Sequence, residues 1–235
     1  MFKPFQPDAE LRIHRGNLPH WRQKDVTYFV NGRLADSIPQ SKLRQWDDER
    51  LAWLKRHGFE SKEELDARAD DSTRNEFHAR CTKRWHEWLD AGFGDRVLRG
   101  SELRQHMIAR LSETADNGHC DLDAWVIMPN HFHALVTPRP GVELGTIIQK
   151  WKGGSARAIN LALGRKGKLW QAEPFDHIVR SEPQFLHYRR YIADNPIKPN
   201  LPDGDYSLGL GKVVWASAQS LKAHLETNSN ESESS

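Results

Sequence analysis

Two histidines stand in the middle of an apolar run, AWVIMPNHFHALVTP, at residues 124–138. Alternate residues of a strand point to the same face, so His131 and His133 would project together while Phe132 and Ala134 face the other side. Two adjacent imidazoles can share one metal cation, and ligation would offset the cost of burying them. The H-x-H spacing is short, however, and two ordinary polar histidines on a half-exposed strand would give the same pattern.

A second group of reactive side chains lies in FLHYRRYIADNP, at residues 185–196. Tyr191 and Asn195 are four residues apart, so they share one face of a helix. If that face packs over the histidine strand, Asn195 adds an oxygen ligand and the Tyr191 hydroxyl stands beside the cation. A tyrosine there can attack a phosphodiester, and the covalent tyrosyl phosphate conserves the bond energy for rejoining strands without ATP. Alternatively, Tyr191 is core and Asn195 only ends the helix, while Tyr188 and, more weakly, Tyr206 compete for the nucleophilic role.

The ligand types indicate which cation such a site would take. Two imidazoles and one amide oxygen, with positions left open for phosphate oxygens, suit Mg²⁺ or Mn²⁺. A structural zinc site is normally closed by four ligands, and the sequence offers no further pair to close one.

The elements that must position these residues follow from the hydrophobic period and from the turn residues. The pattern predicts a strand over 26–35, three helical segments between 41 and 117, two strands (DAWVIM and HALV) joined at Pro129 and Asn130, a helix over 144–163, a strand over 175–180 and a helix over 181–194. Ser101 is placed to cap the third helical segment, and Ser181 with Gln184 has the spacing of a capping box. Strands and helices that interleave around a hairpin favour an α+β fold with a central antiparallel sheet.

The composition of the 235 residues sets limits on the class of protein. No apolar stretch approaches the roughly 18 residues of a membrane helix, and the amino end lacks the apolar core of a secretory signal. We therefore expect a soluble protein of the cytoplasm, with Cys81 and Cys120 as free thiols. The net charge is only +2, yet residues 145–200 hold ten Lys or Arg against four Asp or Glu. A polyanion would dock on that segment, unless it is simply a solvated surface.

The motifs resemble a known family. AWVIMPNHFHALV resembles the histidine–hydrophobic–histidine (HUH) motif of single-tyrosine transposases, and YIADNPIKPNL resembles the tyrosine helix of the subfamily called REP-associated tyrosine transposases. Five further segments are similar to that subfamily in the expected order: LPHW at 18–21, VTYFVNGRLADSIP at 26–39, IIQKWKGGSARAINLALGR at 147–165, LWQAEPFDHIVR at 169–180 and VVWASA at 213–218.

The resemblance implies a fold, a reaction and a set of site residues. The fold is ferredoxin-like or RRM-like, and the reaction is cleavage of single-stranded DNA beside a hairpin of a palindromic repeat, leaving a 5′-phosphotyrosine and a free 3′-hydroxyl. His131 and His133 match the family's metal ligands, Asn195 falls where relatives carry an amide ligand, and Tyr191 matches the nucleophile. Tyr188 has no counterpart in the motif. The resemblance also implies a bacterial protein that works at the nucleoid as a monomer or a homodimer.

The basic segment supplies candidates for DNA contact. Four residues are candidates for phosphate contacts: Lys152, Arg157, Lys168 and Arg180. Trp151 and Trp170 would either stack on unpaired bases or belong to the core.

We expect one catalytic domain over 1–222 and a disordered polar tail over 223–235. A helical insertion at about 41–117 exceeds what the smallest relatives place before the histidine hairpin. It would be an added lobe or a DNA clamp. Eleven Lys or Arg against twelve Asp or Glu between Ser41 and Asp90 favour the lobe.

Three functions remain open on these residues. The first is a DNA strand transferase with Tyr191 as nucleophile. The second is a hydrolytic, metal-dependent nuclease that uses the same histidines with water as nucleophile. The third is a non-catalytic nucleic-acid binding module with incidental histidines. Loss of the Tyr191 hydroxyl would abolish the first activity and largely spare the second. A chelator would not change the DNA affinity of the third, which would cut no strand.

Overall fold

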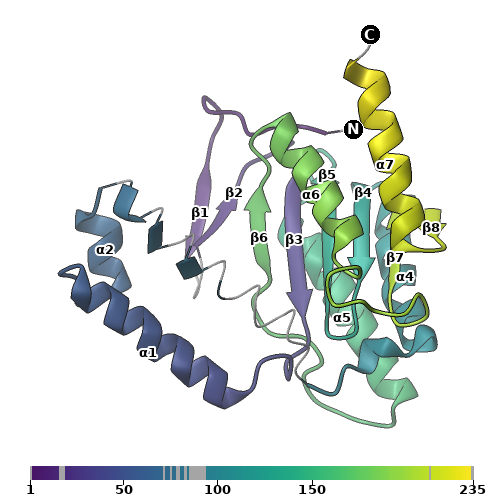
Figure 1. Ribbon diagram of the computed structural model, residues 1–235, viewed down its shortest axis with the longest axis horizontal. Helices are drawn as coiled ribbons and strands as arrows, with labels where there is room; N and C mark the ends of the chain where they lie inside the picture. The colour runs from purple at the N-terminus through teal and green to yellow at the C-terminus, as the bar shows by residue number, and fades with distance from the viewer. Residues whose placement is uncertain are drawn as a thin grey trace. The chain divides into compact units, whose positions relative to one another are not determined.

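The computed structural model describes residues 2–15, 19–70, 72–74, 76–77, 80–81, 84, 94–211 and 213–233. It separates into two compact units, one formed by Met1–Ala35 with Arg96–Ser235 and the other by Asp36–Asp95. The first unit is built around a six-stranded antiparallel sheet in the order β6-β3-β5-β4-β7-β8 (Figure 1). Its strands are β3 (Tyr28–Arg33), β4 (Cys120–Ile127), β5 (His131–Pro138), β6 (Phe175–Ile178), β7 (Ser207–Leu210) and β8 (Val213–Trp215).

The centre of this sheet follows a known succession of elements. Strands and helices alternate as β3, α4 (Ser101–Asp116), β4, β5, α5 (Leu144–Ala162) and β6. This βαββαβ succession, with the strand order β6-β3-β5-β4, is the ferredoxin-like arrangement. The predicted α+β fold with a central antiparallel sheet is therefore confirmed, and β7 and β8 extend the sheet beyond β4.

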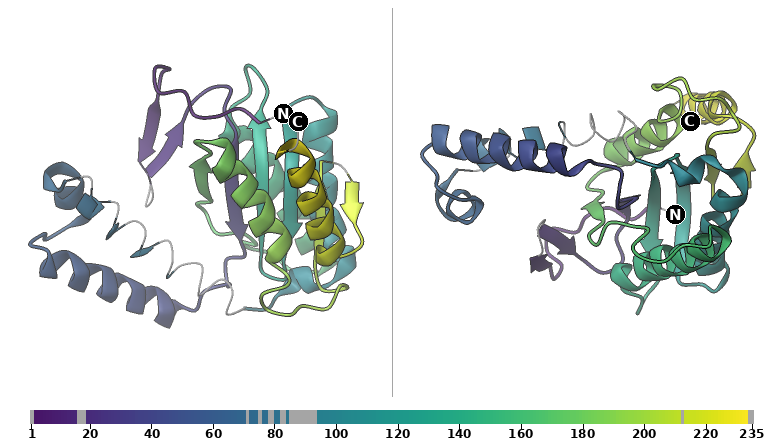
Figure 2. Two further views of the ribbon diagram at one scale, coloured as in Figure 1. Left: turned by 45° about the horizontal axis from the view of Figure 1, so that its top comes forward. Right: turned by 90° about the horizontal axis from the view of Figure 1, so that it is seen from below.

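Helices cover both faces of the sheet, as the right-hand view of Figure 2 shows. Helices α4 and α5 lie on one face, and α6 (Glu182–Asp194) and α7 (Ala218–Glu233) lie on the other. The core under α4 and α5 includes Met107, Trp151 and Phe132. The core under α6 and α7 includes Phe29, Ile192 and Leu221. Because the sheet is covered on both sides, its central strand β5 is buried at every position and reads as an apolar run.

The residues of β5 divide between the two cores according to strand alternation. Phe132 and Ala134 pack on the α4 and α5 side, while Leu135 packs on the α6 side. Gly32 of β3 lies directly opposite Phe132. A Cβ atom at Gly32 would come within 2.2 Å of Phe132 Cε1, so the aromatic ring occupies the space that a side chain on β3 would take.

The second unit, Asp36–Asp95, is helical in its described part. It contains α1 (Gln40–Arg56) and α2 (Lys62–Arg68), with further helical residues between 72 and 84. Trp53, Leu65 and Phe77 belong to its hydrophobic core. Trp85 and Trp88, expected on the second helical stripe, lie outside the described residues.

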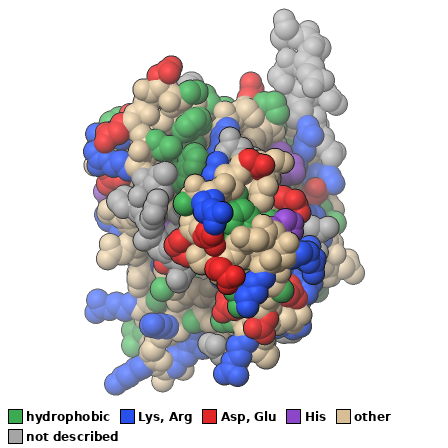
Figure 3. All heavy atoms as spheres, turned by 90° about the vertical axis from the view of Figure 1, so that its left-hand side faces the viewer, with side chains coloured by type: hydrophobic (Ala, Val, Ile, Leu, Met, Phe, Trp, Pro, Cys, Tyr) green, Lys and Arg blue, Asp and Glu red, His purple; other side chains and the backbone are tan. Residues whose placement is uncertain are grey.

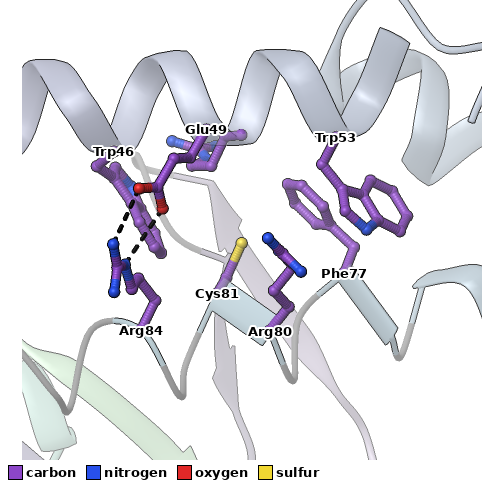
Figure 4. A pocket seen from close by; sticks show the side chains of 8 residues that line it. Trp46, Glu49, Trp53, Phe77, Arg80, Cys81 and Arg84 are labelled. Atoms are coloured by element: carbon purple, nitrogen blue, oxygen red, sulfur yellow. Dashed lines mark hydrogen bonds and ion pairs between the residues drawn. The ribbon is translucent and has the colours of Figure 1, made fainter. Parts of the chain in front are cut away.

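An open cavity lies beside this core, and Glu49 and Arg84 form an ion pair of 3.0 Å across it (Figure 4). The residues that line it are Trp46, Glu49, Arg50, Trp53, Phe77, Arg80, Cys81 and Arg84. Figure 3 shows Asp and Glu side chains interspersed with Lys and Arg on the face turned to the viewer.

The helical residues expected as one insertion over about 41–117 are divided between the two units. Helix α4 belongs to the sheet unit because its apolar stripe faces the sheet. Arg104, only 2% exposed, also ties α4 to the loop before β7 by donating hydrogen bonds to the Gly204 carbonyl oxygen at 2.7 Å and to Ser207 Oγ at 2.9 Å. The predicted cap at Ser101 is wrong. The helix begins one residue earlier, with Gly100 as N-cap and its carbonyl oxygen accepting from Arg104 N.

Helix α7 runs to Glu233 and so includes most of the segment, 223–235, for which the polar composition predicts disorder. Leu221 and Leu225 bury their side chains in the core and hold its first turns. The polar residues after Leu225 continue a helix that these leucines start, which explains the difference from the expectation. None of the helices in the described ranges combines the length and apolarity needed to span a bilayer.

A two-stranded hairpin, β1 (Arg12–Arg15) and β2 (Pro19–Arg22), packs beside β6 through a buried ionic cluster. Asp176 of β6 is fully buried, and its carboxylate accepts from Nδ1 of His20 at 2.6 Å and from Nη2 of Arg22 at 3.0 Å. Burial alone would raise the pKa of Asp176, but the hydrogen bonds from His20 and Arg22 and the charge of Arg22 outweigh burial and lower this pKa.

We expect Asp176→Asn to destabilise the protein by about 3–5 kcal/mol, because it leaves the Arg22 guanidinium desolvated without its anion. Urea unfolding followed by circular dichroism measures the change. Since the Asp176 pKa is lower in the folded state than in the unfolded state, its contribution is present at neutral pH and lost as the pH falls through the folded pKa. Asp121→Asn, which breaks the exposed pair with Arg139, is the control and should change stability by less than about 1 kcal/mol.

Candidate active site

His131 and His133 project from the face of the sheet that α6 covers. Their side chains are 2% and 1% exposed, and their ring centroids lie 4.9 Å apart. Phe132, between them, belongs to the opposite core. The common face predicted from strand alternation is present, and the histidines are buried instead of half-exposed.

Two asparagine amides contact the ring nitrogens that face away from this common surface. Asn130 Oδ1 lies 2.7 Å from Nδ1 of His131. An amide oxygen can only accept, so Nδ1 carries the proton, and Nε2 is the nitrogen of this tautomer that can ligate a cation. The Asn31 amide lies 3.3 Å from Nδ1 of His133. The atom of Asn31 at this distance is Nδ2, which donates to Nδ1.

Helix α6 brings Tyr191 against the histidines. The helix begins as the capping residues predicted, because the Ser181 hydroxyl accepts from Gln184 N and the Gln184 side chain accepts from Arg180 N. The Tyr191 ring stands edge-on to the His133 ring, with the centroids 5.2 Å apart. The tyrosine face of the helix therefore packs over the histidine strand.

The two competing tyrosines are held in positions unsuited to attack. Tyr188 stacks flat on Phe29 with centroids 4.2 Å apart, and burial raises the pKa of its hydroxyl. Tyr206 is 5% exposed, with its hydroxyl donating to Asp203 and accepting from Ala218 N. Burial and the neighbouring Asp203 raise its pKa to about 12. A phenol that loses its proton less readily is a poorer nucleophile.

Asn195 supplies an oxygen at the end of the same helix. The side chain is 2% exposed, and its buried Oδ1 accepts no hydrogen bond from any residue that the structure describes. Tyr188 lies over Phe29 and Tyr191 over His133, so the next turn of α6 carries Asn195 on in the direction of His131. A buried amide oxygen without a donor on this path fits a cation held jointly with the two imidazoles.

A metal site here depends on that amide. Within the described ranges, no three His, Cys, Asp or Glu side chains are grouped so that they could hold a metal ion. The donor set of His131, His133 and Asn195 expected from the sequence stays a prediction.

Lys198 is a neighbour of the tyrosine that the sequence did not indicate. Its Nζ lies 4.7 Å from the centre of the Tyr191 ring. The two residues are seven apart, a spacing that shares a helix face, but α6 ends between them and Pro196 follows. The approach therefore depends on the turn after the helix. A cation at this position favours negative charge on the phenol oxygen.

We expect Lys198→Gln to slow any reaction that needs the Tyr191 phenolate by about tenfold, because the variant removes this charge and keeps a side chain of similar length. The initial rate of tyrosine–DNA adduct formation measures the effect. Lys166→Gln, a matched loss of one exposed cation, is the control. Equal rates for Lys198→Gln and the native protein would contradict a role for Lys198.

The four basic residues expected to contact phosphates lie on three segments. Lys152 and Arg157 are on α5, Lys168 follows that helix, and Arg180 precedes α6 and lies over the Trp21 ring at 5.4 Å. Arg157, Lys168 and Arg180 are exposed, whereas Lys152 donates hydrogen bonds to the backbone carbonyl oxygens of Gln171 and Ala172. Their contact with DNA remains a prediction.

Trp151 and Trp170 belong to the core and are not a surface for stacking. They are 0% and 5% exposed, and their indole nitrogens donate to Thr114 and Ser155.

Part of this chain is similar to known proteins. A curated relative from Escherichia coli, a REP-associated tyrosine transposase, is 28% identical and covers 33% of this chain and 45% of the relative. A protein of Haemophilus influenzae described as uncharacterized is also 28% identical, over 32% of this chain and 54% of the relative. The chain thus spans about half the length of the curated relatives it matches.

A solved structure, described as the REP-associated tyrosine transposase bound to a REP hairpin, aligns with a TM-score of 0.40 and 17% identity over 77% of this chain and 74% of that one. The sequence model of the family described as "Transposase IS200 like" matches residues 95–195, which include both histidines, Tyr191 and Asn195. Through this segment, the chain is similar to the IS200-like transposase family.

Proposed function

We propose that this chain is a metal-dependent endonuclease and strand transferase that cleaves single-stranded DNA beside a hairpin through a 5′-phosphotyrosine on Tyr191. The observation that carries this proposal is the contact between the Tyr191 and His133 rings, 5.2 Å apart, on the covered face of the sheet. Both motifs in this contact belong to one chain, which supports a site formed within a single monomer.

In the proposed reaction, the Tyr191 hydroxyl oxygen attacks the scissile phosphorus. The new bond joins Tyr191 to the 5′-phosphate, and the bond from phosphorus to the 3′-oxygen breaks. The phenol proton leaves, and the departing 3′-oxygen takes up a proton to become a free hydroxyl. Because the ester count does not change, a 3′-hydroxyl of another strand can reverse the reaction and release Tyr191.

The side chains of the covered face would hold the reactants in place. His131, His133 and Asn195 would hold a divalent cation, Mg²⁺ or Mn²⁺, which supplies charge to polarise the phosphoryl oxygens and orient them for in-line attack. Asn130 would hold the His131 imidazole through Nδ1 in the tautomer that offers Nε2 to the cation. Lys198 stabilises the phenolate, and the Phe29 edge contact at 5.8 Å fixes the tyrosine ring.

The substrate class rests on the motifs and on the E. coli relative, whose name associates it with REP elements. Such repeats are palindromic and fold back into hairpins when single-stranded. The basic excess of residues 145–200 is suited to the DNA backbone. We infer that the chain acts on repeats of a bacterial chromosome.

The test is a denaturing gel assay with labelled single-stranded hairpin oligonucleotides taken from repeats that flank the gene. We expect a denaturant-resistant protein–DNA adduct with Mn²⁺ or Mg²⁺ and none with EDTA. An adduct that forms only with the hairpin, and not with a scrambled strand of equal length, establishes the substrate class. Cleavage without adduct would instead indicate hydrolysis by water, and binding without cleavage would indicate a non-catalytic module.

A further inference from the structure

Arg33 lies next to the histidine pair on the covered face of the sheet. It is the last residue of β3 and stands directly opposite His131 in the antiparallel register. Asn31 and Phe29, two and four positions earlier on the same face, contact His133. Side chains directly opposite on adjacent strands are about 5 Å apart at Cβ, so Arg33 and His131 are immediate neighbours.

The loop before β6 fixes the direction of the Arg33 side chain. Its Nε donates to Gln171 Oε1 at 2.6 Å, while Gln171 N donates to the Arg33 carbonyl oxygen at 2.9 Å. Gln171 therefore holds the guanidinium through its side-chain amide and the Arg33 backbone through its own N–H. Burial lowers the pKa of Arg33 to about 9, which reflects the cost of keeping this charge away from water.

A second cation reaches the same residue from the opposite helical layer. Lys152 of α5 donates from Nζ to the carbonyl oxygens of Gln171 at 2.5 Å and Ala172 at 2.8 Å. Burial and then the charge of Arg33 lower the pKa of Lys152 to about 8, while the charge of Glu173 acts in the opposite direction. Among the described residues, no carboxylate lies within ion-pair distance of Lys152.

We propose that Arg33 and Lys152, held by Gln171, form a subsite for one backbone phosphate of the DNA strand, on the β6 side of His131. Two cations that repel each other are stabilised together by one shared anion, and a planar guanidinium presents paired donors to phosphate oxygens. The subsite rests on the proposed function for the identity of its ligand. It would fix the position of the strand relative to Tyr191.

The experiment measures DNA binding without cleavage. The full-length Tyr191→Phe protein is titrated into a fluorescent single-stranded hairpin oligonucleotide in EDTA, and fluorescence anisotropy gives the Kd. A series of oligonucleotides carries one neutral methylphosphonate linkage each. We expect one linkage to weaken binding by about tenfold, since a charge-assisted phosphate contact is lost there.

The same series is then measured with Lys152→Gln and Gln171→Glu added. Lys152→Gln should remove most of the sensitivity to that linkage and lower the slope of log Kd against log salt by about 0.7, the value for one phosphate on a single strand. Gln171→Glu places a carboxylate between the two cations and should weaken binding by about tenfold with the fold intact. Lys55→Gln, which removes an exposed cation of α1 outside the basic segment 145–200, is the matched control and should change the Kd less than twofold.

Thermal unfolding checks that each variant is folded. If Lys152→Gln and Gln171→Glu are folded and bind the whole series as the Tyr191→Phe protein does, the subsite is wrong even when the native protein forms its adduct. If the linkage effect follows Lys152 while the native protein forms no adduct, the subsite stands and the proposed strand transfer fails.

Discussion

Tyr191→Phe is expected to abolish the protein–DNA adduct, with a loss of at least about 10⁴-fold in its initial rate, because no other atom of the side chain can attack phosphorus. The substitution removes one oxygen and keeps the ring that contacts His133 and Phe29. The fold and the affinity for the hairpin should therefore remain close to native. The adduct is measured on denaturing gels and the affinity by anisotropy.

Tyr188→Phe is the matched control, since it removes the same oxygen from a residue one turn earlier on α6. It should leave the adduct rate within about threefold of native, because a hydroxyl with a raised pKa beside Gln184 takes no part in the attack. Strand cutting that survives Tyr191→Phe would assign the reaction to water, and an adduct lost only in Tyr188→Phe would move the nucleophile by one turn.

His131→Ala and His133→Ala are expected to reduce adduct formation by about 10³-fold each, the effect of losing several kcal/mol of charge stabilisation. A readout independent of activity is thermal unfolding with and without metal. At 100 times its Kd, a cation bound only by the folded state adds about 2.7 kcal/mol, which raises the Tm of a chain of this size by several degrees. Native protein should show this rise in Mn²⁺, and both variants should not.

His187→Ala provides the comparison, because it removes an exposed imidazole from α6 beside Tyr188. Its Tm should rise in Mn²⁺ as much as that of the native protein. An unchanged metal response in His131→Ala would show that the buried histidines do not hold the cation, whatever the effect on the adduct. Asn195→Ala tested in the same way reports on the third ligand.

Local periodicity was sufficient to predict the parts of the fold that carry the candidate site. The alternation along β5 predicted that the histidines share a face, and the four-residue spacing on α6 predicted the side that Tyr191 and Asn195 occupy. These patterns survive folding because each reflects the geometry of a single element. The sequence could not predict that α6 packs on the histidine strand. The structure shows this packing in the contact between the Tyr191 and His133 rings.

Features that depend on distant residues could not be predicted from the sequence. The Asp176 cluster joins β6 to a hairpin more than 150 positions earlier, and neither periodicity nor composition encodes that contact. Lys198 approaches the Tyr191 ring only because of the turn that follows α6. Arg33 and Lys152 come together because both bind Gln171, a residue of the loop before β6. The apolar period of α4 predicted which residues of the helix are buried, but not that they pack on the sheet. The predicted insertion therefore ended after α4, whereas in the structure the helical unit ends before it.

Gly32 makes the position of the two histidines depend on the core under α4 and α5, on the opposite face of the sheet. Its missing side chain admits the Phe132 ring against β3, and this ring is clasped by Trp151 and Trp170 at 6.1 and 5.4 Å. Because Phe132 separates the two histidines along the chain, any repositioning of its ring changes how both imidazoles are splayed. The residues that fix the two imidazoles therefore include more than the histidine motif itself. A designer who transplants the histidine pair into another sheet must also carry across the glycine and the aromatic clasp behind it.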